Sequence, residues 1–75
     1  MTMNGGARDR ALVFEFMDQS QDKTGYNCWF TAGYLSEMLH FPKQQMYRIL
    51  NYLYSQRRIE RITHFGYAHR WRVVK

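Results

Sequence analysis

Side chains that can donate hydrogen bonds gather in one short stretch of the chain, residues 43–51. They are amide, guanidinium, ammonium and phenol groups, on Lys43, Gln44, Gln45, Tyr47, Arg48 and Asn51. Such groups donate to phosphate oxygens, and arginine and glutamine also pair with purine edges in a major groove. The chemistry that this stretch indicates is recognition of an anionic ligand rich in hydrogen-bond acceptors.

A helix over about residues 42–55 is predicted to position these groups. Met46, Ile49, Leu50 and Leu53 fall at i, i+3, i+4 and i+7, which is one apolar stripe of a 3.6-residue period. Pro42 suits the start of such a helix, because its fixed φ is already helical and its missing N–H is not needed there. The polar side chains then face outward. An ordinary solvated helix face would have the same pattern.

Charge is divided unevenly along the chain. Residues 1–42 carry a net charge of −2 and residues 43–75 a net charge of +7, which together give the overall +5. The positive charge therefore coincides with the predicted helix and the residues after it, as expected for a surface that meets a phosphate backbone. A membrane would attract the same charge, but no apolar run approaches the ~20 residues of a spanning segment. Double-stranded DNA is the expected partner, and no membrane is expected.

Two further helices are predicted before residue 42. The first covers Arg8 to about Gln19, with Leu12, Val13, Phe16 and Met17 as its inner stripe, and comes after a disordered tail over residues 1–7. A polar loop over residues 20–27 and a short strand at 28–30 come next. The second helix is capped by the Thr31 hydroxyl and buries Ala32, Leu35, Met38 and Leu39. His40 then takes the positive φ of a tight turn, since histidine is among the few non-glycine residues enriched there.

The end of the chain reads as a β-hairpin. Residues 59–63 and 68–74 are β-compatible runs joined by a connection that contains Gly66. In the second run His69, Trp71 and Val73 alternate with Arg70 and Arg72, so one face can close a core while the other stays basic. The two arginines are also explained as solubilising charges on an edge strand.

The segment 41–50, Phe-Pro-Lys-Gln-Gln-Met-Tyr-Arg-Ile-Leu, is followed, after six intervening residues, by Arg-Arg-Ile-Glu-Arg. This pattern resembles the DNA-binding part of IclR-type bacterial transcription regulators, and the chain is similar in size to the small FaeA-type fimbrial regulators. The resemblance covers about residues 12–74. It implies an α+β winged helix-turn-helix over residues 8–75, with three helices, a small antiparallel β-hairpin wing at Phe65–Tyr67, and groove or phosphate contacts from Lys43, Gln44, Gln45 and Arg48. One departure is Gln56-Arg57-Arg58, where the family usually has a glycine.

Other chemistry has little support in the sequence. The three histidines and Cys28 lack the C-x-x-C or H-E-x-x-H spacing of a metal site, and no glycine-rich phosphate loop or nucleophile elbow is present. No catalytic residue, metal or cofactor is expected. A single cysteine excludes an internal disulfide and fits a cytoplasmic location.

The aromatic content exceeds the needs of a small core, with six tyrosines, five phenylalanines and two tryptophans. The expected core rings are Phe14, Phe16, Trp29, Phe30 and Trp71, and the expected surface rings are Tyr26, Tyr52 and Tyr54. Exposed tyrosines are typical of protein interfaces, so a homodimer or a larger regulatory protein is a possible partner. Stacking of single-stranded nucleic acid on these rings is a further alternative.

The sequence thus predicts sequence-specific duplex binding by a small transcriptional regulator. The expected DNA-binding side chains are Lys43, Gln44, Gln45, Tyr47, Arg48, Arg57, Arg58, Arg70 and Arg72. The alternative is a winged helix that binds a larger protein regulator or complex and uses its basic face for that contact.

Overall fold

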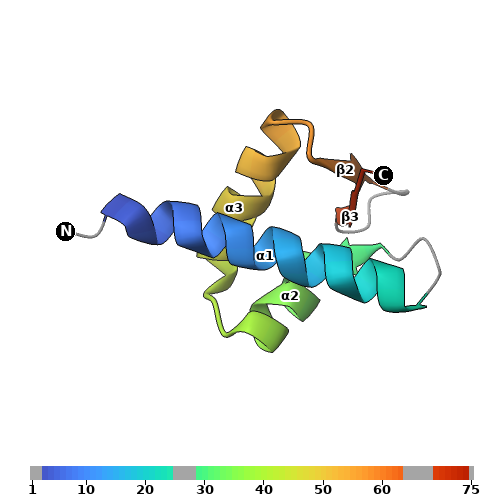
Figure 1. Cartoon of the computed structure of the whole chain (residues 1–75), viewed down its shortest axis with the longest axis horizontal. Helices are drawn as coiled ribbons and strands as arrows, with labels where there is room; N and C mark the ends of the chain where they lie inside the picture. The colour runs from blue at the N-terminus through green and yellow to red at the C-terminus, as the bar shows by residue number, and fades with distance from the viewer. Residues whose placement is uncertain (1–2, 25–28, 64–68, 75) are drawn as a thin grey trace.

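The computed structural model describes residues 3–24, 29–63 and 69–74. Its elements in chain order are α1 (Met3–Thr24), β1 (Phe30–Thr31), α2 (Ala32–Leu39), α3 (Lys43–Ser55), β2 (Ile59–Ile62) and β3 (Arg70–Val73). The three strands form one antiparallel sheet in the order β1-β3-β2. This α+β arrangement has the winged-helix topology that the sequence predicts (Figure 1).

Helix α1 runs along the length of the molecule and crosses both α2 and α3, while β2 and β3 lie beyond the end of α3 (Figure 1). It begins at Met3 and not at Arg8, and it continues to Thr24 through part of the predicted loop. Residues 20–24 contain neither proline nor glycine. Once a helix is nucleated, each such residue adds a hydrogen bond, so polarity alone does not stop it. The predicted turn at residues 64–67 lies outside the described residues.

Helix α2 begins and ends as the sequence predicts. The Thr31 hydroxyl accepts a hydrogen bond from the Tyr34 N–H at 3.1 Å, which satisfies one of the free donors of the first turn. At the other end His40 has φ 61° and ψ 42°, and the Phe41 N–H donates to the Ser36 carbonyl at 3.1 Å. The left-handed conformation of His40 turns the chain within two residues, and α3 then starts after its N-cap, Pro42.

Helix α3 ends in the same way, at a second non-glycine residue. Arg57 has φ 61°, its N–H donates to the Tyr54 carbonyl at 2.9 Å, and the Arg58 N–H donates to the Leu53 carbonyl at 3.0 Å. The pair of bonds is a Schellman motif with arginine at the position that usually holds glycine. Arg57 therefore ends the helix where the resembled family uses glycine, and it turns the chain toward β2.

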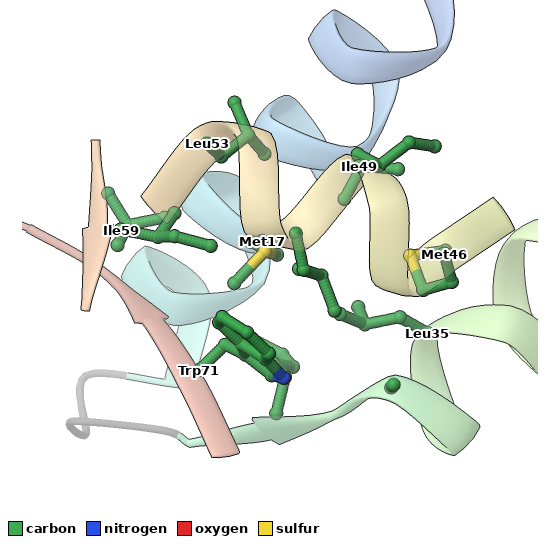
Figure 2. Close-up of a cluster of buried hydrophobic side chains, with 12 residues drawn as sticks. Met17, Leu35, Met46, Ile49, Leu53, Ile59 and Trp71 are labelled. Carbon is green, nitrogen blue, oxygen red and sulfur yellow. The ribbon is translucent and has the colours of Figure 1, made fainter. Parts of the chain in front are cut away.

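The sheet separates an inner from an outer face. Phe30, Ile59, Trp71 and Val73 are buried against the helices, and Trp71 points from β3 toward Met17 and Leu35 (Figure 2). The core continues through Val13, Ala32, Met46, Ile49, Leu50 and Leu53. All four residues of the predicted α3 stripe are thus buried, which turns the polar residues of α3 outward.

Three predicted core residues lie elsewhere. Leu12 and Met38 are 47% and 49% exposed, because α1 and α2 each bury a narrower stripe than the sequence suggested. Trp29 is half-buried and not in the core, and the Arg72 guanidinium lies 4.5 Å from the centre of its ring. Phe14 and Phe16 pack against the core from its border, while Tyr52 and Tyr54 are exposed as predicted. Tyr26 is outside the described part of the chain.

Leu50→Ala is predicted to destabilise the protein by about 2 to 5 kcal/mol, because it leaves a cavity in the core beneath α3. Asn51→Ala, one position along the same helix on its exposed face, is the control and should change stability by less than about 0.5 kcal/mol. Chemical denaturation followed by circular dichroism measures both. Equal stability of Leu50→Ala and the parent would mean that α3 is rotated relative to this structure.

Candidate nucleic-acid interface

The outward face of α3 is rich in hydrogen-bond donors and carries no acidic residue. Its exposed side chains are Lys43, Gln44, Tyr47, Arg48, Asn51 and Ser55. They project because the opposite stripe of the helix is fully packed against α1, α2 and the sheet. The helix has 13 residues, so this face is about 20 Å long at 1.5 Å per residue.

One flank of α3 is fixed against α1. The Gln45 side-chain amide donates to the Asp9 carboxylate at 2.9 Å, and the Arg10 guanidinium lies 4.1 Å from the centre of the Tyr52 ring. Gln45, which the sequence predicted to be a base contact, is therefore half-buried and bonded within the protein. Its neighbour Gln44 is exposed and has no such bond among the described residues.

The other flank meets the sheet through aromatic rings. Tyr54 packs edge-on against Trp71, with ring centres 6.2 Å apart. The Arg61 guanidinium lies 4.4 Å from the centre of the Tyr54 ring and 5.7 Å from that of Trp71. These contacts join the last turns of α3 to β2 and β3, so the helix and the strands of the hairpin keep one relative orientation.

The predicted arginines divide into free and engaged groups. The Arg72 Nε donates to the Glu60 carboxylate at 2.8 Å on the outer face of the sheet, in addition to covering Trp29. Arg58 stacks 4.1 Å from the centre of the Phe14 ring on α1. Arg57 and Arg70 are exposed, and no side-chain bond with another described residue ties them.

The predicted site residues are thus only partly assembled on one surface. Lys43, Gln44, Tyr47 and Arg48 lie together on α3, with Arg57 directly after that helix. Arg70 and Arg72 belong to the outer face of the sheet, in register with Ile62 and Glu60, so they face away from the core. The predicted wing tip, Phe65–Tyr67, lies outside the described residues.

Arg61 was absent from the predicted set, although its spacing contained a signal. It is two residues after the buried Ile59, and strand residues two apart share a face. Its backbone partner is Trp71, so its side chain starts from the inner side of β2 at the end of the core. A basic residue there extends over the nearest ring, which belongs to α3.

No protein-family model matches the chain, and no curated protein sequence is significantly similar to it. Within residues 3–24, 29–63 and 69–74, no group of three or more potential metal ligands is present. In the same residues no helix combines the length and the hydropathy needed to cross a bilayer.

Gln45→Glu is predicted to destabilise the protein by about 1 to 3 kcal/mol, because it replaces a hydrogen bond to the Asp9 carboxylate with a second negative charge. Gln44→Glu is the matched control in the same helical turn. It should be neutral or slightly stabilising, since an exposed carboxylate near a helix N-terminus interacts well with the helix dipole. Denaturation midpoints of the two variants compare them directly, and equal midpoints would contradict the assigned Asp9–Gln45 contact.

Proposed function

We propose that this protein binds duplex DNA through the exposed face of α3 and acts as a small transcriptional regulator. The observation that carries the proposal is the α3 face itself, where donors project from a helix fixed on both flanks and no acidic residue interrupts them. A helix of 10–12 Å diameter fits a major groove about 12 Å wide. The resemblance of residues 41–50 to IclR-type regulators, and of the chain's size to FaeA-type regulators, also favours this proposal.

Carboxylates border the α3 face, but none belongs to α3 itself. Asp9 accepts from Gln45 at 2.9 Å, and Glu60 accepts from Arg72 at 2.8 Å. Glu37 on α2 is exposed and lines a hollow with Lys43 at the start of α3. Arg48, Arg57 and Arg61 remain as exposed cations along the rest of the helix and its end.

Within this proposal the division of labour on α3 depends on exposure. Gln44, Arg48 and Asn51 are spaced at i, i+4 and i+7, so they form the centre of the exposed face and are the candidates for base edges. Gln45 acts indirectly, because its bond to Asp9 fixes α1 beside the recognition helix. Lys43 and the arginines after the helix are candidates for phosphate contacts.

A second candidate function is binding to another protein through the α1–α2 side. Leu12, Tyr34 and Met38 are 47%, 46% and 49% exposed there. Phe16 links two of the elements, because its ring centre is 6.4 Å from that of Tyr34. Exposed apolar and aromatic side chains of this kind serve dimers and larger assemblies. Tyr34 lines one hollow with Lys43, so this surface borders the α3 face at the start of that helix.

The affinity for duplex DNA should fall steeply with salt. Lys43, Arg48, Arg57 and Arg61 can neutralise about four phosphates, and each adds about −0.9 to the slope of log affinity against log salt concentration, for a slope of about −3 to −4. Fluorescence anisotropy with a mixed-sequence duplex at several salt concentrations measures it. A flat response, together with a salt-insensitive complex with another protein, would reject DNA binding in favour of the second candidate.

Gln44→Ala should cost about 1 to 3 kcal/mol of binding energy at one base pair and relax the preference there, because a glutamine amide pairs bidentately with adenine. Binding to a duplex selected from a random pool, and to its single-base variants, measures the preference at each position. Gln19→Ala on the exposed stripe of α1 is the matched control and should leave binding unchanged. Uniform weakening on all sequences would instead assign Gln44 to a phosphate.

A further inference from the structure

Two arginines line one groove at the bend between α3 and the hairpin. A surface groove at this bend is lined by Tyr54, Ser55, Arg57 and Arg61, together with residues of β2. One arginine comes from the end of α3 and the other from β2, so the groove is bounded by both elements. We refer to Arg57, Arg61 and Tyr54 together as the elbow.

Arg61 is oriented by the ring beneath it. Its guanidinium lies 4.4 Å from the centre of the Tyr54 ring, and Tyr54 is itself held by Trp71, which is fully buried. Stacking uses the flat face of a guanidinium and leaves its N–H groups directed outward along its edges. A fork of donors fixed in this way matches the oxygens of a phosphate and loses little conformational freedom on binding one.

Arg57 occupies a backbone conformation that arginine seldom adopts. Its φ of 61° is in the left-handed region, where glycine avoids the steric cost that a Cβ brings. The two backbone hydrogen bonds that end α3 offset that cost, but the exposed side chain itself makes no bond to another described residue. The Schellman motif at the end of α3 requires a left-handed residue at position 57, but it does not require a guanidinium there. An arginine at a position that favours glycine therefore indicates a use for its side chain.

The carboxylate at the groove does not oppose a negative ligand. Glu60 lines the same groove, but Arg72 binds its Oε1 at 2.8 Å from the neighbouring strand. Ser55 donates its hydroxyl to the Tyr52 carbonyl at 2.7 Å, so it has no proton left for a ligand. The positively charged donors among the residues that line the groove are the two guanidinium groups.

We propose that the elbow is a phosphate-binding site, in which Arg57 and Arg61 each hold one of two adjacent backbone phosphates of the duplex whose groove α3 enters. The inference rests on the proposed DNA-binding function and adds the groove, the orientation of Arg61 by Tyr54 and a role for the arginine at the left-handed position 57. The contact is to the backbone, so it carries no sequence preference and fixes the position of α3 along the groove.

Arg57→Gly separates folding from binding, because it should increase the stability of the protein and decrease its affinity for DNA. Glycine removes the steric cost at φ 61°, so the denaturation midpoint should rise, while the loss of the guanidinium should lower the salt slope by about 0.9 and weaken binding alike on every sequence. Fluorescence anisotropy with a mixed-sequence duplex gives the slope. A higher midpoint with an unchanged slope would make Arg57 a structural residue only and overturn the proposal.

Variants of Arg61 and Tyr54 test the stacked fork. Arg61→Ala should lower the salt slope by about 0.9, whereas Arg61→Lys should keep the slope and still bind more weakly, because the charge remains without the fork. Tyr54→Phe keeps the ring and should bind duplex as the parent does. Tyr54→Leu removes the ring, so it should keep the salt slope and bind more weakly, as expected for Arg61→Lys. Arg8→Ala, on the exposed stripe of α1, removes the same charge away from the elbow and should change nothing.

Failure of the elbow and failure of DNA binding give different results. If the parent protein shows no salt-dependent binding to duplex, DNA binding itself is rejected, and the elbow with it. If the parent binds with a steep slope but Arg57→Gly and Arg61→Ala keep that slope, DNA binding stands and the elbow is rejected. An equal loss for Arg8→Ala would assign the effect to overall charge and would also reject the elbow.

Discussion

Burial of the Trp71 indole holds the helices and the sheet in one arrangement. The side chain has no exposed surface, and it packs from the central strand toward Met17 of α1 and Leu35 of α2 (Figure 2). Its backbone pairs with Phe30 on one side and Arg61 on the other, so the same residue sets the register of both strand pairs. Tyr54 of α3 packs edge-on against it. Positions on the α3 face and at the elbow are therefore fixed relative to one large buried ring.

Two left-handed residues determine how the chain changes direction around α3. His40 turns it between α2 and α3, and Arg57 turns it between α3 and the hairpin, both at φ 61°. In each case the first residue after the turn donates back to the preceding helix, which satisfies a carbonyl that the helix end would leave free. The two turns carry polar side chains where glycine is easiest, so each adds a functional group to a bend. At Arg57 that group lines the same groove as Arg61, the second arginine of the proposed phosphate site.

The basic half of the chain supplies fewer free cations than its charge suggests. Arg72 and Glu60 neutralise each other across the outer face of the sheet, and Arg58 covers Phe14. Side chains with long apolar stems readily cover rings while their charge stays near water, so such arginines contribute to packing as well as to potential. The same effect makes Arg61 useful, because the ring beneath it orients a guanidinium that remains exposed. Neighbouring side chains, and not composition, thus determine which arginines stay free to contact a ligand.

The sequence by itself determined the winged-helix order of elements, the buried stripe of α3, the Thr31 cap, the start at Pro42 and the turn at His40. Each depends on local rules, namely a repeat of 3.6 residues, a cap hydroxyl or a fixed φ, which neighbouring residues satisfy without distant contacts. Only the tertiary structure decided that Gln45 bonds to Asp9, that Trp29 lies outside the core and that Arg61 joins the α3 side while Arg72 does not. The two residues of each contact lie on different segments of the chain. Gln45 and Asp9 are 36 residues apart in the sequence, and Arg61 and Tyr54 are 7 residues apart. Arg72 is 43 residues from Trp29 and 12 residues from Glu60. Which side chains meet across such separations depends on how the helices cross and on the register of the strands, and periodicity along one segment carries no information about either.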